Sequence, residues 1–171
     1  MIIKKTPENK FVLSYDKTAK VYLDPNRVEA GVNILTDWER NINEGRIFNL
    51  AGQYEAGNFY FQAFLQSKLK SAEAKKLFFV IRDNEGLNYL YCPTDISDAV
   101  LKEISLEFEK IDAVLFKELS AGSISKIKSY FKPLVWIGFS DRSRALDLKR
   151  EKTNEVKINS KKIAPVFYLM H

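Results

Sequence analysis

The segment Leu77-Phe78-Phe79-Val80-Ile81 decides the fold, because it is a continuous apolar run with the length of one strand. Such a run is typical of a strand that is covered on both faces. The polar segment 82–86 that follows ends in glycine, as many turns do, and apolar residues return from Leu87 to Tyr91. The pattern predicts a β-hairpin at the centre of a sheet.

Further strands are predicted on both sides of this hairpin. Short apolar runs with strand character, or with weak alternation at 155–159, occur at 11–15, 20–23, 134–139, 155–159 and 166–170. The first two runs flank 16–19, which predicts a four-residue hairpin loop. Pro25 ends the second run, because proline cannot donate a hydrogen bond to a sheet.

Helical spacing of apolar residues occurs in three regions. The clearest runs from Ile96 to Leu115, with Thr94 or Asp95 as the expected N-cap and Asp98 in the first turn. A short second helix is predicted from Ile124 to Phe131, because a proline follows it at position 133.

Two other regions are read as helical with less support from the pattern. Apolar residues from Val28 to Ile42 recur at steps of three and four. The length of 53–69 also favours a helix, although its local run 58–61 could equally be a strand.

These elements predict an α+β fold, with a mostly antiparallel sheet and about three to four helices packed on it. The 171 residues fit a single domain spanning 1–171. Within it, 1–24 form N-terminal strands and 140–163 form a basic loop or edge region. No apolar run has the length of a membrane span, and the near-absence of cysteine fits a cytoplasmic protein.

Histidine and cysteine are nearly absent, which excludes several kinds of chemistry. The one histidine is His171 and the one cysteine is Cys92. Catalysis by an imidazole base, a cysteine–histidine pair and a thiolate zinc site are therefore excluded. Neither GxGxxG nor GxxxxGK[ST] occurs, so no nucleotide loop is expected. We expect no cofactor, no metal and a structural role for Cys92.

Positive charge is concentrated in the region 126–162, which holds eleven Lys or Arg residues against four Asp or Glu residues. This asymmetry indicates an anionic partner, either nucleic acid or an acidic protein surface. The loop Ser140-Asp141-Arg142-Ser143-Arg144 is the favoured phosphate-binding locus, because arginines bind phosphate bidentately. The side chains expected to contact nucleic acid or phosphate are Arg142, Arg144, Lys149, Arg150, Lys152, Lys157, Lys161 and Lys162. The alternative is a solvated lysine-rich surface.

Aromatic residues in the segment 53–69 exceed what one helix face needs. A partner surface formed by Tyr54, Tyr60, Phe61 and Phe64 is one interpretation, and a helix buried on two sides is the other. Trp136 and Phe139 are expected in the core.

Carboxylate chemistry has one weak candidate. Asp147 and Glu155 could share a magnesium ion, with Lys157 stabilising developing charge. This pattern arises often by chance in a lysine-rich chain. The function predicted first is therefore a non-enzymatic protein that binds nucleic acid through its basic region. A protein-interaction module, such as an inhibitor, immunity or adaptor protein, is the alternative, and a magnesium-dependent nuclease is the second. The composition is typical of accessory proteins of phages or mobile elements.

Overall fold

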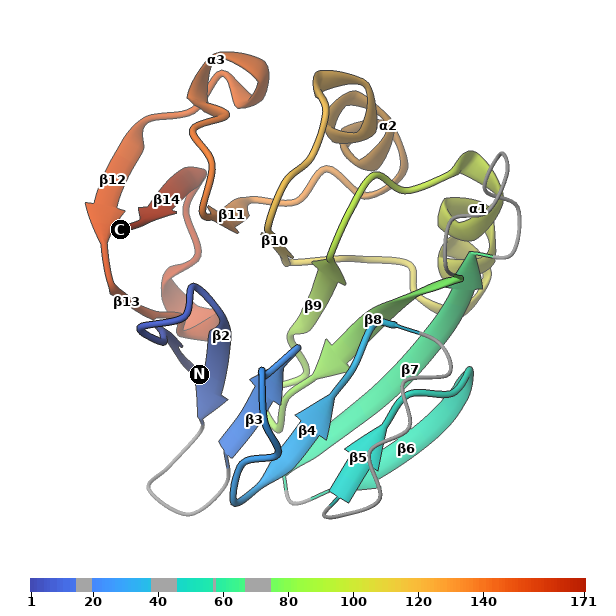
Figure 1. The fold of residues 1–171 in the computed structure, drawn as a ribbon. Helices are drawn as coiled ribbons and strands as arrows, with labels where there is room; N and C mark the ends of the chain where they lie inside the picture. The colour runs from blue at the N-terminus through green and yellow to red at the C-terminus, as the bar shows by residue number, and fades with distance from the viewer. Residues whose placement is uncertain (15–19, 38–45, 57, 67–74) are drawn as a thin grey trace.

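The computed structural model describes residues 1–14, 20–37, 46–56, 58–66 and 75–171. Within these residues the strands form two mixed sheets that pack face to face (Figure 1). Sheet A has the order β13-β1-β2-β3-β4-β5. Its strands are β1 (Ile2–Lys5), β2 (Phe11–Ser14), β3 (Lys20–Leu23), β4 (Val32–Ile34), β5 (Arg46–Phe48) and β13 (Glu155–Lys157).

Sheet B has the order β12-β14-β11-β10-β9-β8-β7-β6. Strands β6 to β9 pair antiparallel, whereas β9, β10, β11, β14 and β12 run parallel. The strands are β6 (Gly52–Ala56), β7 (Phe59–Gln66), β8 (Lys76–Arg82), β9 (Asn88–Cys92), β10 (Ala113–Phe116), β11 (Val135–Gly138), β12 (Arg150–Thr153) and β14 (Val166–Met170).

The helices cover the face of sheet B that points away from sheet A (Figure 1). They are α1 (Asp98–Glu107), α2 (Ala121–Phe131) and the short α3 (Ser143–Leu146). A 3-10 helix at Ser160–Lys162 lies elsewhere, between Ile158 and Ile163, which pack in the core between the two sheets. Among the described residues, no helix is long and apolar enough to cross a membrane.

Strand β8 explains this layered arrangement, because its side chains alternate between two cores. Phe79 and its odd-numbered neighbours lie between the two sheets, whereas Phe78 and Val80 lie under the helices. Residues 77–81 are all fully buried. The predicted central hairpin is confirmed as β8 and β9, which pair antiparallel.

Helix ends follow local sequence. Ser97, not Thr94 or Asp95, is the N-cap of α1, and its hydroxyl accepts a hydrogen bond from the Val100 amide. Asp98 lies in the first turn as predicted. Helix α2 ends as predicted at Phe131, where Lys132 adopts a left-handed conformation with φ 50° before the proline.

The predicted fold class is wrong in three respects. The stretch 53–66 is the hairpin β6–β7, because β7 is buried between the layers rather than on one helical face. The described part of 28–42 contains β4, which is held between β3 and β5, while 38–42 lie outside the described residues. The predicted helix 96–115 ends at Glu107, and 113–116 form β10. Strand β10 makes sheet B mixed rather than mostly antiparallel, because it joins β9 and β11 in parallel.

Other predicted strands are confirmed. Strand β14 spans 166–170, β11 spans 135–138 and β13 spans 155–157. Trp136 is fully buried, as expected, and its indole nitrogen donates to the Pro133 carbonyl over 3.2 Å. Phe139 is half-buried against the core between the sheets. The predicted hairpin loop at 16–19 lies outside the described residues.

Candidate functional site

The carboxyl ends of β9, β10 and β11 lie side by side at one end of sheet B, because the three strands run parallel. We call this end of the sheet the strand-end edge. Binding sites in parallel sheets form at this edge. The loops that follow the strands are joined by hydrogen bonds. The Ser120 amide donates to Asp95 Oδ1 over 2.7 Å, and Arg142 Nε donates to the Leu119 carbonyl over 2.7 Å. This edge is therefore an ordered cluster of loops.

A buried carboxylate, Asp24, joins the two sheets at this edge. It follows β3 in a left-handed conformation with φ 48°. Asp24 Oδ1 accepts hydrogen bonds from the Thr36 amide at 2.7 Å and the Thr36 hydroxyl at 2.9 Å. From sheet B, the Tyr91 hydroxyl at 2.7 Å and Lys117 Nζ at 2.8 Å donate to Oδ2. Four donor groups therefore surround one carboxylate.

The electrostatics of this cluster favour an ionised Asp24. Burial acts to raise the pKa of Asp24, but Lys117 and the hydrogen bonds from Thr36 and Tyr91 outweigh it, so that the pKa lies below its usual value. Burial, and then the Asp24 charge, raise the pKa of Tyr91 well above its usual value. Tyr91 therefore remains a hydrogen-bond donor at neutral pH.

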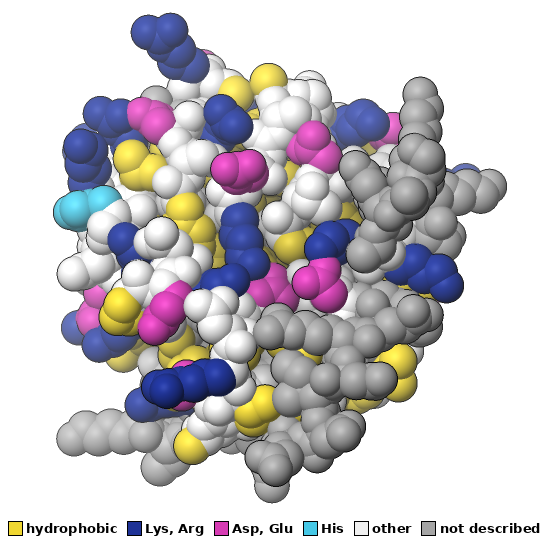
Figure 2. Space-filling view, viewed as in Figure 1, with side chains coloured by type: hydrophobic (Ala, Val, Ile, Leu, Met, Phe, Trp, Pro, Cys, Tyr) yellow, Lys and Arg dark blue, Asp and Glu magenta, His cyan; other side chains and the backbone are white. Residues whose placement is uncertain are grey.

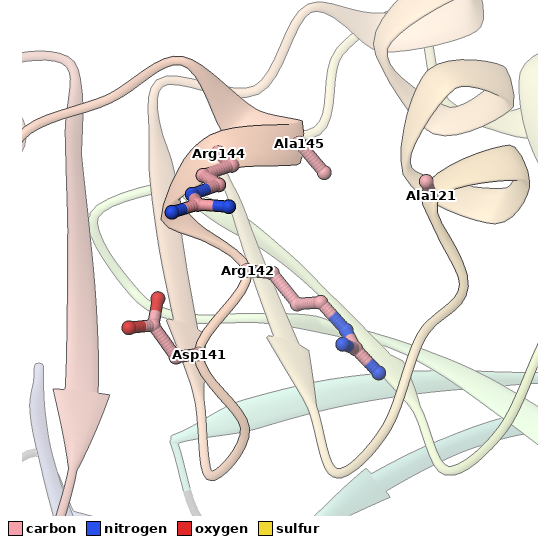
Figure 3. A pocket seen from close by; sticks show the side chains of 5 residues that line it. All are labelled: Ala121, Asp141, Arg142, Arg144 and Ala145. Atoms are coloured by element: carbon pink, nitrogen blue, oxygen red, sulfur yellow. The ribbon is translucent and has the colours of Figure 1, made fainter.

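An arginine-lined pocket of about 440 Å³ lies at the same edge, between α3 and the start of α2 (Figure 3). Ala121 and Ala145 line it on opposite sides, together with Asp141, Arg142 and Arg144. The predicted phosphate-binding loop thus contributes most of the lining. The N-terminus of α2 adds a partial positive charge.

The two arginines of the pocket are held differently. Arg142 is half-buried and extends toward the loop before α2, where it bonds Leu119 (Figure 3). Burial acts to raise the pKa of Asp95, but hydrogen bonds from Ser120 and Ser123, and then the charge of Arg142, outweigh it, so that the pKa lies below its usual value. Arg144 is exposed, and among the described residues its guanidinium has no hydrogen-bond or ion-pair partner. Arg144 is therefore available to a ligand.

The other basic residues of the predicted interface lie outside the arginine-lined pocket, and Lys149 and Lys157 line a separate pocket of about 200 Å³ together with Glu151. Arg150 pairs with Asp141, Lys149 with Glu151 and Lys157 with Glu155. Lys152 and Lys161 are exposed on β12 and the 3-10 helix, and the Lys162 side chain lies outside the described part. On the face in Figure 2, acidic side chains separate the Lys and Arg side chains.

The remaining predicted site residues are also spread over the fold. Phe61 and Phe64 are buried, whereas Tyr54 and Tyr60 are half-buried. Glu155 on β13 pairs with Lys4 at 2.7 Å and with Lys157 at 3.6 Å, and Asp147 is exposed after α3. Cys92 is fully buried, and this burial raises the pKa of its thiol.

Sequence reasoning missed Asp24 and Lys117. Asp24 stands before Pro25, a pattern that predicts only the end of a strand. Lys117 lies 93 positions further along the chain, where no local pattern links the two. The sequence offers one signal for both residues: Asp24 and Lys117 are polar, and each directly follows an apolar run that forms a strand.

The acidic, histidine and cysteine residues that the structure describes are dispersed over the fold. Within the described ranges, no group of three or more such side chains is arranged to hold a metal ion. The carboxylate of Asp24 is already surrounded by donors. His171 is the single histidine of the whole sequence.

No family model and no curated protein matches the sequence. The fold, however, is similar to two solved structures. One is a protein from Thermotoga maritima classed as a Zn-dependent hydrolase of the metallo-β-lactamase superfamily, with a TM-score of 0.70 and 14% identity over 99% of this chain and 98% of that one. The other is a variant of CmlA β-hydroxylase, with a TM-score of 0.59 and 9% identity over 80% of this chain and 45% of that one.

These likenesses correct the functional prediction. A non-enzymatic nucleic-acid-binding protein, a protein-interaction module and an accessory protein of a phage or mobile element were expected, but both similar structures are named as enzymes. The zinc ion that the first name implies requires several His, Cys or acidic ligands, and the residues at this edge do not supply them. The chain has a metallo-β-lactamase-like fold, and the donor residues in its described part do not fit a zinc centre.

Proposed function

We propose that this chain is an enzyme that acts on a small molecule carrying a phosphate or carboxylate group, which the arginine-lined pocket holds. The observation that carries this proposal is the pocket of about 440 Å³ with Arg142 and Arg144 in its lining. A pocket of this volume suits a small molecule. Arginine suits a phosphate or carboxylate because its donors match two oxygen atoms.

The two arginines have different parts in this proposal. Arg142 is fixed by its bond to the Leu119 carbonyl and by the charge of Asp95, so that its position is set before the ligand arrives. Arg144 has no partner among the described residues and closes on the anionic group. A prearranged cation lowers the entropy cost of binding.

Hydrolysis is the reaction class that we assign, and the fold's likeness to a protein classed as a hydrolase supports it. Without a zinc centre, the charged groups at the strand ends are those of the chain itself. Lys117 can stabilise negative charge that develops on a substrate. We place the enzyme in the cytoplasm, which its single buried thiol supports.

The first test is a calorimetric titration with phenyl phosphate and benzoate, with phenol as the uncharged match. We expect both anions to bind and phenol not to bind. Replacing Arg144 with glutamine should weaken anion binding about 10- to 100-fold, because a hydrogen bond to a charged group contributes about 1.5–3 kcal/mol. Lys149→Gln removes the same charge from an exposed residue outside the pocket and should change the affinity less than twofold.

Hydrolysis is then followed with p-nitrophenyl phosphate and with the mono-p-nitrophenyl ester of succinic acid, each of which carries an anionic group. If Arg144→Gln and Lys149→Gln weakened anion binding equally, the anions would be attracted to the basic region in general and not held in the pocket. Binding without turnover of any phosphate or carboxylic ester would contradict the enzymatic part of the proposal.

A further inference from the structure

We infer that this chain binds no zinc ion, and that the cation at the carboxyl ends of its strands is the ammonium group of Lys117. This inference goes beyond the proposed function and does not depend on it. It starts from a disagreement between the fold, which resembles that of a protein classed as a Zn-dependent hydrolase, and the side chains that this chain places at the edge of sheet B.

The described carboxylates that are buried already accept hydrogen bonds from the protein. Asp83 accepts from the amides of Glu85 and Leu87 and from the Tyr89 hydroxyl. Asp112 Oδ2 accepts from the Asn88 amide, whereas Oδ1 has no hydrogen-bond partner among the described residues and lies 2.5 Å from Lys110 Nζ, whose positive charge it faces. A metal ion would have to displace these donors, and each displaced buried donor would lose its partner.

Asp24 shows the same condition at the strand-end edge itself. Both of its oxygen atoms accept hydrogen bonds, and three of its donor groups are neutral. The fourth, Lys117 Nζ, lies 2.8 Å from Oδ2 and brings the positive charge that balances the carboxylate. The charge requirement that a metal ion could satisfy is therefore already met by a side chain.

The softer zinc ligands are equally unsuited. Cys92 is fully buried in β9, and its pKa is raised by burial, so the sulfur is a thiol rather than the thiolate that zinc binds. His171 is exposed, and its amide donates to the Thr153 carbonyl beside the edge strand β12. A single exposed imidazole supplies one of the roughly four ligands of a structural zinc site.

Lys117 differs from the other lysine that pairs with a buried aspartate. Its side chain is 27% exposed, against 64% for Lys110. Lys117 also stands on the loop whose carbonyls accept from Ser140 and Arg142, so its charge lies among the loops of the candidate site. Lys110→Gln is therefore a matched control for Lys117→Gln.

The experiment measures zinc directly in the full chain. The protein is produced in zinc-supplemented medium, dialysed without chelator and analysed by mass spectrometry for metal content. Its melting temperature is then recorded with zinc chloride, with magnesium chloride and with EDTA. We expect less than about 0.1 zinc per chain, because the described residues contain no preformed ligand set. The melting temperature should shift by less than about 1 °C in each condition, because a ligand that does not bind the folded state cannot stabilise it.

The second part compares variants by melting temperature. Lys117→Gln should lower it by roughly 5 °C or more, because the buried Asp24 loses its counter-charge, and Lys117→Arg should restore at least half of the loss. Lys110→Gln should lower it by less than about 2 °C. Stoichiometric zinc that EDTA removes with a loss of stability would overturn the inference, whatever the variants do. Equal effects of Lys117→Gln and Lys110→Gln would overturn the role of Lys117. Neither result depends on whether the pocket binds anions, which the titrations above measure separately.

Discussion

The two ends of strand β10 each hold a lysine paired with a buried aspartate, but the two pairs differ in origin. Before the strand, Lys110 pairs with Asp112, two residues away, over 2.5 Å. After the strand, Lys117 pairs over 2.8 Å with Asp24, which belongs to sheet A. The first pair is local and its lysine is mostly exposed, whereas the second links distant segments and is largely enclosed.

The difference shows what each aspartate does. Asp112 organises the start of the parallel strands: its carboxylate accepts from the Asn88 amide, and its carbonyl accepts from the Val135 amide. Asp24 holds the two sheets together at their other end through Thr36 and Tyr91. The pair before β10 therefore connects neighbouring strands of sheet B. The pair after β10 connects sheet A to sheet B among the loops of the candidate site.

The largest effect is expected from removing Asp24. Asp24→Ala leaves Lys117, Tyr91 and Thr36 without their acceptor, and breaking a buried charged pair costs about 3–5 kcal/mol. Asp112→Ala should cost about 1–3 kcal/mol, because its lysine is solvated and one main-chain donor is lost. Urea unfolding monitored by circular dichroism measures both. A larger loss for Asp112→Ala would reverse the ranking of the two ends.

A smaller effect is expected from Gly138, which pairs with Phe116 at the carboxyl end of β10. A Cβ atom at Gly138 would lie 2.3 Å from the Phe116 ring, and that ring stacks on Phe167 at 6.0 Å. Gly138→Ala should therefore cost about 1–3 kcal/mol through overpacking. Gly122→Ala, within α2, should instead stabilise by about 0.5–1 kcal/mol, because its Cβ atom would make only an ordinary contact of 3.7 Å with the Ser120 hydroxyl. Thermal unfolding measures the stability of both variants. A loss only in Gly138→Ala would show that the close packing against Phe116 requires glycine at this position.

The smallest effect is expected in the pH dependence of stability. The pKa of Asp24 is lowered in the folded chain, so this carboxylate contributes stability that is complete above about pH 4 and is lost as the pH falls through its folded pKa. Between about pH 4 and pH 2 the free energy of unfolding should fall less steeply in Asp24→Asn. The difference in slope is at most roughly 1.4 kcal/mol per pH unit, the value for one proton. Part of the fall should remain, because the pKa of Asp95 is lowered as well. An unchanged acid slope in Asp24→Asn would show that Asp24 does not carry this linkage.

The sequence predicts elements well where their pattern is local. The run 77–81 and the helix that ends before Pro133 are confirmed, because a buried strand and a proline stop are properties of neighbouring residues. The pattern of 53–69 favours a helix and leaves 58–61 open to a strand, because aromatic residues buried on both faces of β7 lose the alternation that marks a strand. Strand β10 was merged into α1 because its apolar residues continue the helical spacing.

The candidate site could be predicted only in part. The loop 140–144 was identified because arginines follow an apolar strand, and it lines the pocket. Asp24 and Lys117 meet only after both sheets have formed, so no spacing in the chain reveals them. The mixed character of sheet B could not be predicted for the same reason. Its parallel strands are connected through helices, so the strands that pair are not adjacent in sequence.

The pairing of β1 with β13 gives sheet A strands from opposite ends of the chain. The Met1 ammonium donates to the Ile158 carbonyl, 157 positions away. At a synthesis rate of about 5–20 residues per second, β1 waits roughly 8–30 s on the ribosome before its partner is made. During that interval one edge of β1 is open, and a nascent chain with an open strand edge invites association with its neighbours. Production at lower temperature or with holdase chaperones should therefore raise the soluble yield more than any change at the candidate site.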